Sequence, residues 1–187
     1  MSQFEFVLIP FAIIVGFAIA DLMTSWTVVL KKWEETGDKF LYLSYSIWLV
    51  LNLLFGHYGG LWEYRHLEFT NLVAFAVLMP SLLLTLSMML ISFGRELPPD
   101  VDVHYYSMSG RSVLFAFGSL IVSTLTDLLP GTGFVTEPGM LIPLSLSGIA
   151  LLAMYFGESK KVHVGANIVL WFVWLQFIVL GHLFSQG

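Results

Sequence analysis

One acidic residue inside the first long apolar run is the strongest candidate for chemistry. Asp21 precedes Lys31 by ten residues, which corresponds to about 15 Å along a helix. The hydrocarbon core of a bilayer is about 30 Å thick, so the carboxyl group is expected near the midplane, where ionisable groups usually face a partner or a wet cavity. There it could bind a small cation or carry a proton. The alternative is a neutral carboxylic acid that holds two helices together.

Hydroxyl groups extend this candidate site toward both sides of the membrane. Thr24 and Ser25 follow the carboxylate at helical spacing on one face. Ser119, Ser123 and Asp127 form a second stripe at intervals of four residues in a later run. Together the six side chains predict a transport path for a small cation, a proton or a small polar solute. Alternatively, the serine hydroxyls donate to the carbonyl group four residues back in their own helix.

Two histidines from distant parts of the chain are candidate ligands for a metal or a b-type haem. His57 and His182 are expected near the outer ends of their helices, and imidazole suits both kinds of group. They lie in no spaced ligand motif, so water-facing histidines are the alternative and we otherwise expect no cofactor. Trp171 and Trp174, one turn apart, could stack on a quinone or face lipid. Cysteine is absent, which excludes thiolate ligands and disulfides.

Long apolar helices must position these residues. The chain of 187 residues is 57% hydrophobic and 11% charged, whereas a soluble domain carries roughly 25% charged residues. Backbone polar groups in hydrocarbon must be satisfied within the segment, which favours helices. The sequence therefore predicts an all-α polytopic membrane protein, a single domain over residues 1–187 with six transmembrane helices at about 4–30, 40–62, 69–93, 112–129, 140–157 and 164–184.

The basic residues predict the orientation of these helices. Seven of the eight Lys and Arg residues fall in the first, third and fifth gaps between the apolar runs, and cytoplasmic loops retain positive charge. The N-terminus and the C-terminus are therefore both expected outside. So few basic residues exclude a nucleic-acid surface, which leaves the lipid bilayer as the expected partner. The seven residues are Lys31, Lys32, Lys39, Arg95, Arg111, Lys160 and Lys161.

Small residues recur every four positions in the first apolar run. They are Ala12, Gly16, Ala20 and Thr24, and this spacing lets two helix backbones approach closely. We expect the first helix to pack tightly against another helix. A homo-oligomer is expected, with other membrane proteins as alternative partners.

Three short segments in the first two thirds of the chain form a pattern. They are the run Trp62-Glu63-Tyr64-Arg65, Pro80 within an apolar run, and the segment from Asp102 through Tyr105-Tyr106 to Arg111. In these segments the chain resembles a group of small bacterial polytopic membrane proteins to which no activity is attached. The resemblance implies a multi-pass protein of the bacterial inner membrane. Trp62, Glu63 and Arg65 are interpreted as a structural clamp at the outer end of the second helix.

Three classes of function remain open at this stage. The first is a channel or transporter-like protein that uses Asp21. The second is a membrane subunit that binds haem, a metal or a quinone. The third is an accessory subunit of a larger membrane complex. The sequence contains none of the common motifs of hydrolases, zinc proteases, nucleotide-driven pumps or potassium channels, so an enzyme is not expected.

Overall fold

The part of the chain that the structure describes consists of helices and the turns that connect them. It is a computed structural model that describes residues 3–34, 39–58, 71–127 and 138–184, and within these ranges it has six α-helices and no strand. This confirms the predicted all-α class. The elements are α1 (Gln3–Lys31), α2 (Phe40–Leu51), the π-helix η1 (Asn52–Tyr58) that continues α2, α3 (Asn71–Ile91), α4 (Val101–Asp127), α5 (Pro138–Phe156) and α6 (Lys160–Phe184).

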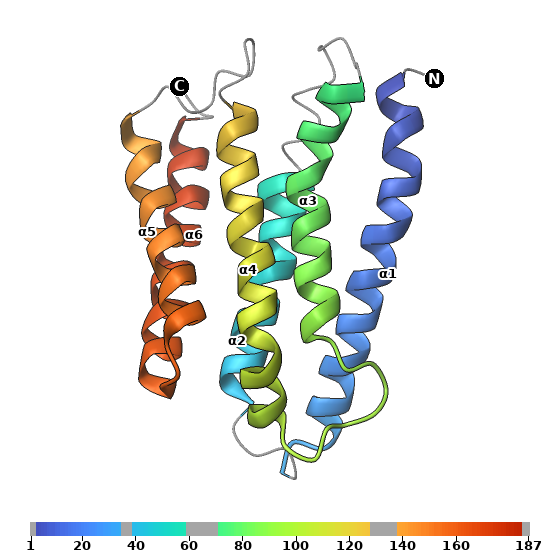
Figure 1. The fold of residues 1–187 in the computed structure, drawn as a ribbon, viewed down its shortest axis with the longest axis vertical. Coiled ribbons are helices and arrows are strands. Elements are labelled where there is room, and N and C mark those ends of the chain that lie inside the picture. The colour runs from blue at the N-terminus through green and yellow to red at the C-terminus, as the bar shows by residue number, and fades with distance from the viewer. Residues whose placement is uncertain (1–2, 35–38, 59–70, 128–137, 185–187) are drawn as a thin grey trace.

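The helices form one elongated bundle in which successive helices alternate in direction (Figure 1). α1 lies at one side, α5 and α6 lie at the other, and α4 and α3 lie between them in front of α2. We call the end where α2, α4 and α6 begin the basic end. It carries six of the cations, Lys31, Lys32, Lys39, Arg95, Lys160 and Lys161.

Three of the described helical segments are long and apolar enough to cross a membrane. They are Leu8–Lys31, Val73–Ile91 and Val101–Thr126. Phe40–Phe55 and Leu141–Phe156 are shorter apolar helices. The composition of α1, α3 and α4 therefore supports the membrane character that the sequence predicts.

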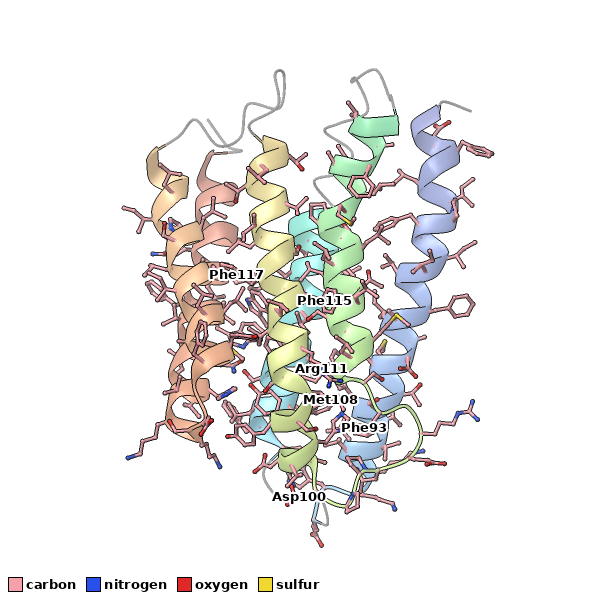
Figure 2. The ribbon with its side chains drawn as sticks, in the orientation of Figure 1. Phe93, Asp100, Met108, Arg111, Phe115 and Phe117 are labelled. Carbon is pink, nitrogen blue, oxygen red and sulfur yellow. The ribbon has the colours of Figure 1, made fainter. Side chains whose placement is uncertain are left out.

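The start of α4 differs from the sequence prediction. The fourth span is predicted from about residue 112, after a long polar loop, but α4 begins at Val101. Asp100 caps the new start, because its Oδ1 accepts the backbone N–H groups of Asp102 and Val103 at 2.8 and 3.2 Å. Polar residues of this segment, including Arg111, therefore lie on a helix rather than in a loop (Figure 2).

α3 and α4 are joined by hydroxyl groups spaced seven residues apart on α4. Ser112 Oγ donates to the Ser87 carbonyl oxygen at 3.0 Å, and Ser119 Oγ donates to the Pro80 carbonyl oxygen at 2.8 Å. Thr126 Oγ1 lies 2.9 Å from the carbonyl oxygen of Ala76 and 2.8 Å from that of Val122 in its own helix, so two acceptors share its single proton. Proline has no N–H to offer the carbonyl group four residues earlier, so the Thr126 hydroxyl can supply a donor where Pro80 has removed one.

This compensation gives a testable prediction. Thr126→Val is expected to lower the free energy of unfolding by about 1 kcal/mol. Pro80→Ala returns an N–H to α3 at the position that can reach Ala76, so Thr126→Val should cost less in that background. Thermal unfolding of the four proteins in detergent measures both costs. An equal cost in the two backgrounds would show that the hydroxyl does not compensate for the proline.

α1 buries one narrow face and exposes the rest. Its buried positions include Phe11, Val15, Ala18 and Leu22, and this face packs mainly on α3. The stripe of small residues lies beside that face, and a Cβ atom added at Gly16 would meet nothing within 4 Å. Within one copy of the chain, the close helix approach predicted for the stripe is therefore not made at Gly16.

α4 also packs against α5 at a glycine. A Cβ atom built at Gly148 of α5 would lie 3.5 Å from Phe117 Cε2 and 3.6 Å from Leu120 Cδ2. Figure 2 shows Phe117 on the side of α4 that faces α5. The α4–α5 contact thus connects the α5–α6 pair to the rest of the bundle.

Candidate functional site

The Asp21 carboxylate lies beside the turn that follows α3. Ser92 Oγ donates to Asp21 Oδ2 at 2.5 Å. Ser25, one turn further along α1, is fully buried, and its Oγ accepts the backbone N–H groups of Phe93 and Gly94 at 3.1 and 2.9 Å. Gly94 has a φ of +63°, the left-handed conformation that commonly ends a helix. Asp21 and Ser25 therefore hold the end of α3 against α1.

The level of Asp21 within the bundle follows from this contact. Asp21 lies level with the end of α3, toward the basic end, and α1 continues ten residues past this level to Lys31. The depth of Asp21 near the midplane of a bilayer stays a prediction.

Among the described side chains of the predicted transport path, Asp21 and Ser25 meet at the turn after α3, while Ser119 contacts another part of α3. Thr24 Oγ1 donates to the carbonyl oxygen of Ala20 in its own helix at 2.8 Å. Ser119 lies on α4 and donates to Pro80 in the middle of α3, whereas Asp21 lies on α1 and contacts the turn after α3. Ser123 is half-buried on α4, and the Asp127 side chain lies outside the described part of the structure.

A second polar group, absent from the sequence-based site, is buried at the basic end between α4 and α6. His163 is 2% exposed. Its Nε2 lies 2.8 Å from the Gly157 carbonyl oxygen, and its Nδ1 lies 3.0 Å from the Tyr105 hydroxyl oxygen. A carbonyl oxygen only accepts, so Nε2 carries the ring proton and Nδ1 accepts the hydrogen bond from Tyr105. The neighbours therefore select one tautomer of His163.

The charge state of His163 follows from its burial. The residue lies just before the predicted sixth span at 164–184, and burial lowers the pKa of its imidazole below the ordinary value, while the hydrogen bond to the Gly157 carbonyl acts in the opposite direction. The ring is therefore neutral at pH 7. A neutral imidazole matches the one donor and one acceptor that the two neighbours require.

The buried polar group continues along α6 to α2. Asn167 Nδ2 donates to the His163 carbonyl oxygen at 3.0 Å, and Ser44 Oγ donates to Asn167 Oδ1 at 3.4 Å. Trp171 Nε1 in turn donates to Ser44 Oγ at 2.9 Å. His163, Asn167 and Trp171 follow one another at intervals of four residues, so they occupy one face of α6. This face is the polar seam between α6 and α2.

The seam ends in a groove at the surface of the bundle. The groove has a volume of about 600 Å³. Its lining residues are Trp33, Lys39, Phe40, Leu43, Ser44, Ile47 and Trp171. The walls are apolar and aromatic, Ser44 and the Trp171 indole bring the end of the polar seam to the groove, and Lys39 places one cation on its lining. This composition suits a molecule that is apolar along most of its length and polar at one end.

Lys39 is held at the groove by Trp33. The Lys39 ammonium lies 3.9 Å from the centre of the Trp33 ring, a cation–π contact, and it also donates to the Trp33 carbonyl oxygen. Trp33 follows the end of α1, and Lys39 precedes α2. The two residues thus fix the position of a positive charge where α2 begins.

Five further predicted site residues have side chains outside the described part of the structure. His57 and His182 belong to η1 and α6, but their side chains are outside the described part, and Trp62, Glu63 and Arg65 lie outside the described residues altogether. Among the side chains that are described, no group of three or more His, Asp or Glu residues could hold a metal ion. The metal or haem site and the outer clamp stay predictions.

Comparison of the chain with protein-family models, with curated proteins and with solved structures found no match. The described part of the structure is all-helical, with three helices apolar enough to cross a membrane. Its basic end carries a buried polar seam and an apolar groove with one lysine.

Proposed function

We propose that this chain is a multi-pass membrane protein that binds an amphiphile, a molecule with an apolar chain and a polar head, in the groove between α2 and α6. The observation that carries this proposal is the lining of the groove, with apolar walls along α2 and polar groups from Ser44, Trp171 and Lys39. An amphiphile-binding protein is not one of the three classes that the sequence leaves open. The nearest of them is the membrane subunit that binds haem, a metal or a quinone, for which Trp171 is a candidate stacking residue.

The proposed topology has six spans, with the basic end in the cytoplasm of a bacterium and both termini outside. The clustering of six cations at one end supports this orientation. Tryptophans are enriched at membrane–water interfaces, and Trp33 lies at that same end. The groove would then open at the level of the lipid headgroups of the cytoplasmic leaflet.

Transport through Asp21 and assembly into a homo-oligomer stay predictions. A path that uses Asp21 would run along the outside of a single bundle, because the carboxylate is exposed on α1, so a further protein surface would have to enclose it. Cation and proton flux into liposomes that contain wild type or Asp21→Asn tests this path. The amphiphile proposal requires no flux.

Binding in the groove can be measured by fluorescence quenching. Purified protein in dodecyl maltoside micelles is titrated with small mole fractions of dibrominated phosphatidylcholine, whose bromine atoms quench indoles that they approach. We expect saturable quenching that Trp171→Phe reduces. Ile47→Phe fills part of the groove and should weaken the apparent affinity at least severalfold.

The matched control is Ile168→Phe, which makes the same substitution at an exposed position of α6 outside the groove. It should bind like wild type. Quenching that rises without saturation, or that is equal in Ile47→Phe and Ile168→Phe, would show that the lipid only partitions over the whole surface and would refute the proposal.

A further inference from the structure

The apolar wall of the groove runs along one face of α2. Phe40, Leu43, Ser44 and Ile47 line it at the spacing i, i+3, i+4 and i+7, which defines a single helix face. Seven residues correspond to about 10 Å along the helix axis. The groove thus follows α2 from its first residue into the bundle, a length that fits the glycerol region and the first part of an acyl chain.

One described cation lies at the mouth of this wall. Lys39 is the one charged residue among the described residues that line the groove. Its ammonium group has three donors, and the contact with Trp33 holds it in place. An anionic group would be attracted to this position, whereas a cationic group would be repelled.

Lys39 also lies directly before the apolar wall. It occupies the N-cap position of α2 and makes no side-chain capping bond there. Its ammonium therefore lies at the end of the wall, where the head of a bound amphiphile would be.

We propose that the amphiphile is a phospholipid of the surrounding bilayer with an anionic headgroup. Its phosphate would contact Lys39, and one acyl chain would lie along Phe40, Leu43 and Ile47. This inference rests on the proposed function, and it adds the chemical class of the ligand. Lys39 is the residue that would select the anionic lipid inside the groove.

The same quenching titration tests the headgroup. We expect dibrominated phosphatidylglycerol to bind wild type about fivefold more tightly than dibrominated phosphatidylcholine, because one lysine near an anionic surface contributes about 1 kcal/mol. Lys39→Gln should remove this preference, because it lowers the affinity for the anionic lipid more than the affinity for zwitterionic phosphatidylcholine, whose choline cation offsets its phosphate. The control is Lys32→Gln, which removes a cation of the basic end that does not line the groove and should keep the preference.

The outcomes separate the two proposals. No saturable quenching by either lipid would refute the proposed function and the inference together. Saturable binding of both lipids with equal affinity would refute the anionic headgroup and leave the groove as an amphiphile site. A preference that survives in Lys39→Gln, or that Lys32→Gln reduces equally, would likewise refute it, since the selectivity would then come from the surface charge of the whole basic end.

Discussion

His163→Phe is expected to lower the free energy of unfolding by about 2–4 kcal/mol, measured by thermal or denaturant unfolding in detergent. The phenyl ring keeps the aromatic packing on Tyr105 and Tyr106, whose ring centres lie 5.4 and 5.1 Å from His163. It cannot replace the hydrogen bonds to the Gly157 carbonyl and the Tyr105 hydroxyl. Each of these two buried groups would be left without its hydrogen-bond partner, and an unsatisfied buried polar group costs about 1–3 kcal/mol.

A double-mutant cycle separates the hydroxyl contact from the rest. Tyr105→Phe removes only the hydroxyl group that bonds to His163 Nδ1, so we expect it to cost less than His163→Phe. The two substitutions combined should cost less than their sum, with a coupling energy of about 0.5–3 kcal/mol. Strict additivity would contradict a Tyr105–His163 hydrogen bond.

The stabilities of wild type and His163→Phe can also be compared as the pH is lowered. Burial lowers the pKa of His163 in the folded protein, so the unfolded chain takes up the proton first, near the ordinary histidine pKa of about 6.5. The contribution of the neutral ring to stability is therefore fully present above that pH and decreases as the pH falls below it. His163→Phe should lose this part of the pH dependence, and an unchanged slope would contradict a buried neutral His163.

The helical fold could be predicted from the sequence because apolar run length alone specifies it. Runs as long as residues 4–30 satisfy their backbone only as helices in an apolar medium, and α1 matches that run closely. The start of α4 was missed because its first turns are polar, and polar residues were assigned to a loop. What decides the helix there is the capping carboxylate of Asp100 and the buried ring of Tyr105.

The polar seam is partly visible in the sequence, since His163, Asn167 and Trp171 share the four-residue spacing of Ser119 and Ser123. The pattern on α6 is hard to recognise because its members belong to three different residue classes. Their partners could not be predicted, because Ser44 and Tyr105 meet them only through the rotation and packing of α2 and α4. Helix rotation is set by neighbouring helices rather than by run length.

The surroundings of Asp21 illustrate the same limit. A count from Lys31 gives a distance along α1, but it does not say where the neighbouring helix ends. α3 ends beside Asp21, so the carboxylate accepts a hydrogen bond from Ser92 in the turn that follows that helix.

Gly157→Ala is expected to be the other strongly destabilising substitution, with a loss of about 2–4 kcal/mol. A Cβ atom at this position would lie 2.5 Å from the Ala153 carbonyl oxygen and 2.5 Å from Val162 Cγ1. A side chain can rotate away, but the carbonyl oxygen belongs to the last turns of α5 and can move only with the backbone. That movement would also displace the Gly157 carbonyl that accepts from His163.

Three variants distinguish this backbone clash from a general effect of glycine replacement. Gly165→Ala makes the same change within α6, where a Cβ atom would meet nothing within 4 Å, so it should leave stability unchanged or raise it by up to about 1 kcal/mol. Val162→Ala removes one of the two colliding atoms, and combined with Gly157→Ala it should recover only part of the loss. Equal unfolding temperatures for Gly157→Ala and Gly165→Ala would show that the turn between α5 and α6 tolerates a side chain. That result would contradict the fixed geometry between Gly157 and His163 that selects the tautomer.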